Sequence, residues 1–128
     1  MAHRVEVVLK PGVKEALGDT VAHRIRRHLH IPVERVSTVE VYTIGGDLPQ
    51  EALLPYAREA LCDPVVQEAH TDGCAALEKE FHWAVEVALR PGVTDNVGRT
   101  AREALALLMG LPIERVPTVH HSRQYLLV

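Results

Sequence analysis

The eight histidines are the side chains in this 128-residue sequence that could most directly bind a metal ion. His28 and His30 lie five and seven residues after His23, whereas two ligands on one helix face need a spacing of three or four residues. His120 and His121 are adjacent on an expected strand, so their side chains point to opposite faces of it. We therefore expect no metal site and interpret the first three histidines as part of a solvated basic helix face.

The two cysteines, Cys62 and Cys74, are the next candidates for chemistry. They lack CxxC spacing, and no histidine is placed to complete a zinc set or to act as a base for either thiol. We expect neither catalysis nor a disulfide from them, which fits a reducing cytoplasm. The amino-terminal segment lacks the apolar stretch of a signal peptide, and no run approaches the roughly 20 apolar residues of a membrane span. We therefore predict a cytoplasmic protein that contacts no membrane.

Four glycines could cradle a phosphate group, because backbone N–H groups converge where a turn meets the start of a helix. They are Gly12, Gly18, Gly92 and Gly98. The sequence contains no GxxxxGK[ST] loop, no GxGxxG after a strand and no GxSxG, so the common nucleotide-binding and nucleophile motifs are absent. We favour a structural role for these glycines, in turns with positive φ or in close strand-to-helix packing. We predict no catalytic residue and no cofactor.

Charge points to no bulk partner, because a formal net charge of -3 provides no basic field for nucleic acid. Arg24, Arg26 and Arg27 form one local cluster that could bind a phosphate or an acidic partner. Three arginines on an amphipathic helix are more often its solvated side. We favour that interpretation.

The elements that must position these residues are duplicated. The sequence from Val5 aligns with the sequence from Val85 without a gap, at an offset of 80 residues. Residues that recur identically are Val5, Glu6, Val7, Leu9, Pro11, Gly12, Val13, Gly18, Thr20, Pro32, Glu34, Arg35, Val36, Thr38 and Val39. Glu34 and Arg35, like Glu114 and Arg115, are expected to form an equivalent local ion pair or a cap at the strand entrance in each copy.

Each copy is expected to open with a strand, a helix and a second strand. The first strands are residues 5–9 and 85–89, and a Pro-Gly pair follows each of them. In copy one an apolar stripe over residues 21–29 predicts a helix that packs on the sheet. Pro32 forbids its continuation, and residues 35–42 alternate with period two as a half-buried strand does.

Copy one continues further than copy two. A helix is expected to start near residues 48–51 and to run to about Cys62, with Pro55 causing either a kink or a later start. A short third strand is expected at residues 65–70. Copy two ends inside or just beyond its second strand. We therefore expect either that the sequence is the amino-terminal piece of a longer protein or that the second helix and third strand of copy two come from another chain.

The predicted fold class is α+β, with tandem β-α-β-α-β repeats that share an antiparallel or mixed sheet covered on one face by helices. The first repeat is expected at residues 1–73, a linker at 74–82, and the second, truncated repeat at 83–128. The strand order is not readable from the sequence.

Two sets of residues carry a resemblance to a known family. The first set is Leu9-Lys10, Val13, Gly18 and Val21, followed by LCDPVV at 61–66, and the second set is residues 90–103 with 122–125. The first set resembles the PurS subunit of phosphoribosylformylglycinamidine synthase, with Asp63 where the family has asparagine. The second resembles the amino-terminal region of long single-chain synthases in which a PurS-like dimer is fused into one chain.

That resemblance implies a PurS-like scaffold in purine biosynthesis, with no catalytic residue of its own. Such units bridge an ATP-dependent synthetase body (PurL-like) and a glutaminase (PurQ-like), so that glutamine-derived ammonia reaches formylglycinamide ribonucleotide. The synthetase body would be present in cis or in trans, and a homo-oligomer is possible. The alternative that duplicated β-α-β units allow is a regulatory module that binds a small molecule between the copies.

The helix of copy two differs from its counterpart, because it is apolar most of the way round from Ala101 to Met109 where copy one carries arginines. Such a helix is normally buried on two sides. We predict that Ala104, Leu107 and Leu108 form a surface for docking a partner domain or chain.

Overall fold

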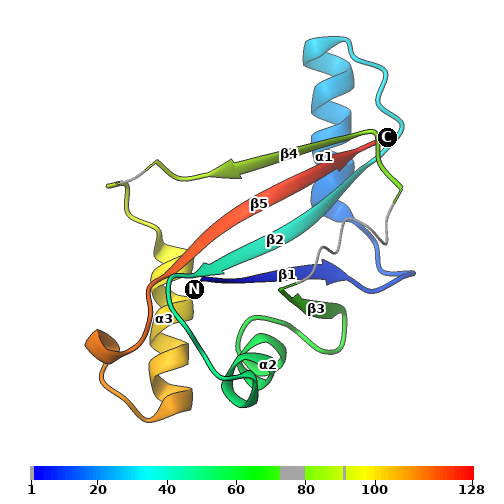
Figure 1. The fold of residues 1–128 in the computed structure, drawn as a ribbon. Helices are drawn as coiled ribbons and strands as arrows, with labels where there is room; N and C mark the ends of the chain where they lie inside the picture. Colours follow the sequence, from blue (N-terminus) through cyan, green and yellow to red (C-terminus); the bar gives the residue numbers. More distant parts are fainter. Residues whose placement is uncertain (1, 73–79, 91) are drawn as a thin grey trace.

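The computed structural model describes residues 2–72, 80–90 and 92–128 of the chain (Figure 1). Its elements are β1 (His3–Leu9), α1 (Ala16–Arg24) with a π-helical continuation (Ile25–Leu29), β2 (Val36–Ile44), α2 (Gln50–Glu59), β3 (Gln67–Thr71), β4 (Trp83–Ala88), α3 (Asn96–Met109), a 3-10 turn (Ile113–Arg115) and β5 (Val119–Leu127). Cys74 and most of the expected linker lie outside the described residues.

The strands form one antiparallel five-stranded sheet in the order β3-β1-β2-β5-β4 (Figure 1). β2 and β5 lie at its centre and pair along their whole length, from Val36 opposite Leu127 to Ile44 opposite Val119. The two halves of the sequence therefore share one sheet, as predicted. Their second strands form the junction.

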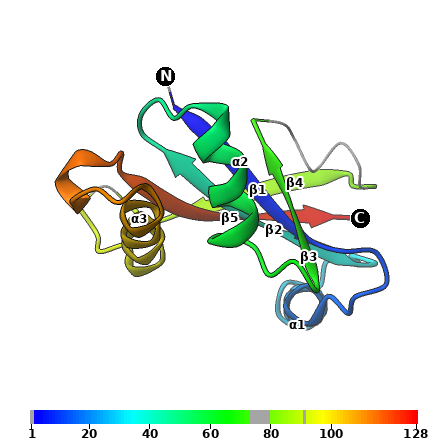
Figure 2. The ribbon, with the colours of Figure 1, turned by 90° about the horizontal axis from the view of Figure 1, so that it is seen from below.

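The helices form a layer on one face of this sheet, which confirms the predicted arrangement. Figure 2 shows α1 and α3 on the same side of β2 and β5, at opposite ends of these strands. The larger core lies under α2 and α3 and includes Val5, Val7, Ile44, Leu48, Leu53, Tyr56, Ala57, Leu61, Ala101, Leu105, Ala106, Val116 and Val119. A smaller cluster under α1 contains Ala22, Val33 and Val36. Each fully buried aliphatic side chain contributes roughly 1.5–3 kcal/mol by leaving water.

The other face of the central strands is also covered. Val8, Val39, Val41 and Leu126 are buried there, and Phe81 packs against them. Phe81 belongs to the connection between β3 and β4, which joins opposite edges of the sheet. Both faces of the central strands are therefore covered over part of their length.

The two halves match at two different offsets. β1 and the start of α1 match β4 and the start of α3 at the offset of 80 that the sequence repeat has. β2 starts at Val36, however, and β5 starts at Val119, an offset of 83. If each β2 residue is replaced by the residue 83 positions later, and each β5 residue by the residue 83 positions earlier, every pair between the strands becomes another observed pair. The halves are thus related by an approximate twofold axis perpendicular to the sheet, with three extra residues before β5.

Close packing of a glycine in each helix supports the offset of 83. A Cβ atom added at Gly18 would collide with the carbonyl oxygen of Val36, and one added at Gly98 would collide with the carbonyl oxygen of Val119. The two glycines are 80 residues apart, while the two carbonyl groups are 83 apart. The same helix-to-strand contact is therefore made in both halves after the slip.

A carboxylate in front of each helix makes a second repeated contact. The Glu15 carboxylate accepts a hydrogen bond from the N–H of Thr38, and the Asp95 carboxylate accepts one from the N–H of His121 at 2.7 Å. These donors are again 83 residues apart and the acceptors 80. The gapless alignment of the second strands, which predicted an offset of 80, is therefore wrong in the structure.

The slip has a cause in the residues before β5. Pro117 replaces Ser37 in the gapless alignment, and a proline inside a paired strand removes a ladder donor. Arg102, which replaces the buried Ala22, donates from Nη2 to the carbonyl oxygen of Val116 at 2.9 Å and from Nε to that of Pro117 at 3.2 Å. These bonds hold the segment outside the sheet. Because an odd shift exchanges the faces of a strand, sequence-equivalent residues of β2 and β5 point to opposite sides.

Several local expectations change in the structure. α2 is one continuous helix from Gln50 to Glu59 that includes Pro55, so the later start predicted there is wrong. Pro55 is the sixth residue of this ten-residue helix, and its missing N–H leaves one intrahelical hydrogen bond unmade. β3 begins at Gln67 and ends at Thr71, slightly later than predicted. In the smaller cluster, Leu29 does not complete the apolar stripe, because it is exposed at the end of the π-helical segment.

The local ion pair predicted for Glu34 and Arg35 is also wrong. The Arg35 Nη2 atom pairs instead with the Glu80 carboxylate at 3.1 Å. Arg26, expected on a solvated face, donates from Nη1 to the carbonyl oxygen of Val33 at 2.9 Å. Arginines therefore fasten the loop before the second strand in both halves, from different turns of the two helices.

Candidate functional site

The predicted docking residues lie on two sides of α3. Leu107 is 84% exposed and Leu108 is 44% exposed, whereas Ala104 is partly buried against the core. Ala104 also lines a hollow between α3 and the end of α2, together with Ala60 and Leu61. The structure therefore separates the predicted trio. The two leucines are the exposed members of the trio.

The end of α3 brings a further apolar residue beside them. Gly110 adopts φ 65°, which ends the helix in the left-handed region that glycine tolerates. The N–H of Leu111 then donates to the carbonyl oxygen of Ala106 at 3.1 Å, so the chain folds back over the last turn. Leu111 is partly exposed there. We call Leu107, Leu108 and Leu111 the α3 leucine surface.

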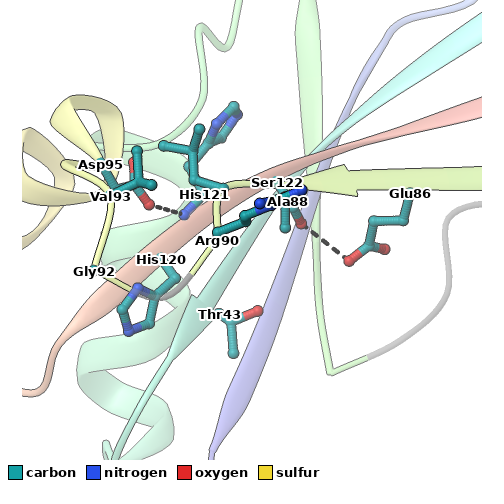
Figure 3. A pocket seen from close by; sticks show the side chains of 11 residues that line it. Thr43, Glu86, Ala88, Arg90, Gly92, Val93, Asp95, His120, His121 and Ser122 are labelled. Atoms are coloured by element: carbon teal, nitrogen blue, oxygen red, sulfur yellow. Dashed lines mark hydrogen bonds between the residues drawn. The ribbon is translucent and has the colours of Figure 1, made fainter.

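A cavity of about 410 Å³ lies between β5 and the loop from β4 to α3 (Figure 3). Its polar lining includes Thr43, Glu86, Arg90, His120 and Ser122. The carboxylates around it are already bonded. Figure 3 shows the Ser122 hydroxyl directed at Glu86, to which it donates at 3.0 Å.

Two positively charged or protonatable side chains of this cavity have no such bonds. Within the described residues we find no hydrogen-bond or ion-pair partner for the side chains of Arg90 and His120. A guanidinium and an imidazole in one cavity can accept a small carboxylate or phosphate anion.

The Glu86 carboxylate of β4 is hydrogen-bonded to an arginine of β1, with β2 and β5 between the two strands in the sheet. Arg4 of β1 donates from Nη2 to the Glu86 carboxylate at 2.7 Å and from Nε to Glu6 at 2.6 Å. The hydrogen bond from Arg4 is the main reason that the pKa of Glu86 lies below its usual value. Glu6 and Glu86 are repeat equivalents, so one arginine joins the two halves across the sheet face that does not carry the helices.

The remaining residues considered for chemistry have structural surroundings. His121 bonds through Nε2 to Glu40 at 2.5 Å, and its neighbour His120 lies on the opposite face. Burial is the main cause that raises the pKa of the Cys62 thiol, which makes it less reactive at neutral pH. No group of three metal-ligating side chains occurs among the residues that the structure describes. Within the same residues no helix combines the length and the apolarity that crossing a membrane requires.

The four glycines have the structural roles that were favoured. Gly12 and Gly92 adopt φ values of 86° and 88° in the turns after β1 and β4. Gly18 and Gly98 make the close helix-to-strand contacts described above. Gly92 in addition lines the cavity of Figure 3.

Taken together, the fold defines a class: a duplicated strand-helix-strand unit that closes into one antiparallel sheet with helices on one face. No family model matches the chain, and no curated protein matches it. Among solved structures it is similar to PurS of Methanocaldococcus jannaschii, described as one of the subunits of formylglycinamide ribonucleotide amidotransferase in the purine biosynthetic pathway. The identity is 20%, the TM-score is 0.49, and the match covers 55% of this chain and 90% of that chain. At this distance the likeness says nothing about the activity of this chain.

Proposed function

We propose that this chain is a PurS-like scaffold component of phosphoribosylformylglycinamidine synthase, built as a fused dimer. The observation that carries the proposal is the junction of the two sequence repeats through β2 and β5, which makes one sheet from both copies. The residues that resemble the family support it, since they are strand, turn and packing residues in both repeats.

In this role the chain would contact a synthetase body, in cis or in trans, and a glutaminase, in the cytoplasm. The α3 leucine surface is the proposed contact with the synthetase body, because two adjacent exposed leucines on a rigid helix end favour association. The chain would support glutamine-dependent amidation of formylglycinamide ribonucleotide without contributing a catalytic group.

The test uses the purified synthetase and glutaminase subunits of such a system without their PurS component. We expect addition of this chain to restore glutamine-dependent product formation and to yield a complex in size-exclusion chromatography. Leu107→Arg is expected to weaken the complex at least tenfold. Leu29→Arg is the matched control, because Leu29 is an exposed leucine at the end of the sister helix. Failure of the unmodified chain both to restore activity and to join the complex contradicts the proposal.

A second candidate is a regulatory module that binds a small anion. The cavity with Arg90 and His120 is the observation that favours it. Isothermal titration calorimetry against nucleotides and amino acids tests it, and sub-millimolar binding that Arg90→Ala abolishes would support this candidate. Heats no larger than the heat of dilution at millimolar ligand would rule out this candidate.

A further inference from the structure

The outer edge of β4 is the feature that the proposed function does not use. β4 is the last strand in the sheet order, and within the described residues no strand pairs with its outer edge. All six of its residues are exposed. An edge strand with free backbone groups and apolar side chains is a template for another strand.

The first half of the chain shows what covers the equivalent strand. β1 matches β4, and the outer edge of β1 is paired with β3 from Val5 opposite Thr71 to Leu9 opposite Gln67. Val7 is 1% exposed in β1, whereas its equivalent Val87 is 56% exposed in β4.

The helix face of β4 is left bare in the same way. The α2 helix lies over β1 in the first half, and Leu53, Tyr56 and Ala57 bury its helix-facing valines. In the second half Trp83 is 73% exposed on the bare strand. The approximate twofold axis relates this bare surface to the surface of β1 that α2 and β3 cover. A second helix and a second strand would therefore fit on it.

A side chain at the corner of this surface matches the pattern. In the first half Lys10 donates from Nζ to the carbonyl oxygen of Pro64 at 2.6 Å, in the connection between α2 and β3. The backbone N–H of Lys10 donates to the carbonyl oxygen of Val66 at 2.8 Å. Its repeat equivalent is Arg90, whose guanidinium has no partner within the described residues. Arg90 is therefore a second donor that lacks the carbonyl group its counterpart has.

Charge indicates the composition of an occupant. The segment that covers β1, residues 45–72, contains six Asp and Glu residues and one arginine. The helix that flanks the bare surface is basic, since α1 and its continuation contain three arginines and one aspartate. At the position where Ala104 lies against the end of α2, α1 presents the exposed Arg24. An acidic helix is the complement of this flank.

We propose that β4 and the adjacent flank of α1 form a docking site for an acidic helix-strand segment of another protein chain. The strand of the partner adds antiparallel to β4, and its helix covers Val85 and Val87. Arg90 donates to a backbone carbonyl at the corner between the partner's helix and strand. Main-chain bonds supply affinity in such strand addition, and alternate side chains supply specificity. The site is separate from the α3 leucine surface and does not depend on the proposed function.

The test supplies a synthetic segment to the intact chain. The probe is a peptide with the sequence of residues 47–72, which is acidic and has the required helix-strand order, added under reducing conditions. Trp83 is the one tryptophan of the sequence and the peptide has none, so its fluorescence reports on the site. We expect a saturable blue shift with a Kd below about 1 mM, which corresponds to roughly 4 kcal/mol. Amide NMR shifts are expected in β4 and α1, and added salt should weaken binding.

Variants make the result specific. Val87→Lys and Arg90→Ala are each expected to weaken binding of the peptide at least fivefold. Both positions are on the surface, so the chain should stay folded. Leu107→Lys is the control and should leave the affinity unchanged. Absence of a saturable signal up to about 1 mM overturns the proposal. Amide shifts confined to β1 and α3 also overturn it, because they indicate exchange with the chain's own α2 and β3. A blue shift that grows with chain concentration alone assigns the edge to a second copy instead.

Discussion

Glu40 of β2 and Arg123 of β5 lie directly opposite each other at the approximate twofold axis, and the Arg123 Nε atom bonds to the Glu40 carboxylate at 2.7 Å. Glu40 also bonds to His121, so the axis is marked by a polar cluster on the helix face. The two positions are equivalent at the offset of 83, yet they hold opposite charges. A symmetric homodimer would place two like charges there, which a single chain with two copies avoids because its halves can diverge.

The pair predicts a charge-reversal experiment. Glu40→Arg should destabilise the chain by about 1–3 kcal/mol, since it places two cations opposite each other in a partly buried pair. The double variant Glu40→Arg with Arg123→Glu should recover part of that loss. Urea denaturation at neutral pH measures both. Equal stability of the single and double variants would show that the pair does not contribute.

The packing of Gly98 predicts a loss of stability on adding a single methyl group. The Cβ atom of Gly98→Ala would meet the Val119 carbonyl oxygen and the Asp95 carboxylate. Overpacking of this kind costs typically about 1–3 kcal/mol. Gly110→Ala is the comparison, because it meets no atom and carries only the strain of φ 65°, about 1 kcal/mol. Urea denaturation of both variants should rank Gly98→Ala as the less stable, and the reverse order would contradict the slipped register.

The carboxylate of Asp95 joins the start of α3 to β5. It accepts hydrogen bonds from the N–H groups of Gly98 and His121, both at 2.7 Å. Asp95→Ala should reduce stability by about 1–2 kcal/mol, the range for losing a helix N-cap. Asp19→Ala, at an exposed position in the first turn of α1, should change it far less. A thermal melt distinguishes the two, and equal melting temperatures would argue against the cap.

Arg4 and Glu86 predict a dependence of stability on pH. The pKa of Glu86 is lowered in the folded chain, first by the hydrogen bond from Arg4, so the ionised form stabilises folding. Its contribution is present above the unfolded pKa near 4.5 and is lost as the pH falls through the lower folded pKa. Glu86→Gln should therefore destabilise the chain at pH 7, by about 1 kcal/mol or less because the carboxylate is partly exposed, and its effect should be smaller at pH 3.

Denaturant titrations at these two pH values check that expectation. Glu103→Gln serves as a comparison, because Glu103 forms only an exposed pair with Arg99 on the surface of α3. A loss for Glu86→Gln that is as large at pH 3 as at pH 7 would point to packing rather than charge.

The buried hydroxyl of Tyr56 links α2 to α3. It donates to the carbonyl oxygen of Ala101 at 2.6 Å, and burial is the main cause that raises its pKa. Tyr56→Phe should cost about 0.5–1.5 kcal/mol for the lost hydrogen bond. Tyr42→Phe, at a less buried position on the same face, is the matched control. Hydrogen exchange at the start of α3 should become faster in the first variant alone.

Much of the local structure was readable before the fold was known. The Pro-Gly pairs, the apolar periodicity and the duplication predicted both strand-helix-strand units and the helix layer. They could not predict that Arg102 and Pro117 move the second strand by three residues. Alternation with period two fits either register, and only contacts between distant segments, such as that of Gly98 with Val119, separate them.

The docking prediction for α3 shows the same division. An apolar helix is visible in the sequence, but the side on which each leucine lies depends on what packs against the helix. Ala104 turned out to lie against α2 and Leu107 to face solvent. The exposed edge of β4 was not predicted, although the second helix and third strand of copy one were seen to have no counterpart within residues 83–128.

The sequence by itself determined that two copies of one unit exist and which residues start, turn and end their elements, because those choices depend on neighbours a few residues away. Only the tertiary structure decided the strand order, the offset of 83 and the exposure of β4. These depend on which backbone groups and side chains contact one another across the sheet, and the spacing of residues along the chain does not predict those contacts.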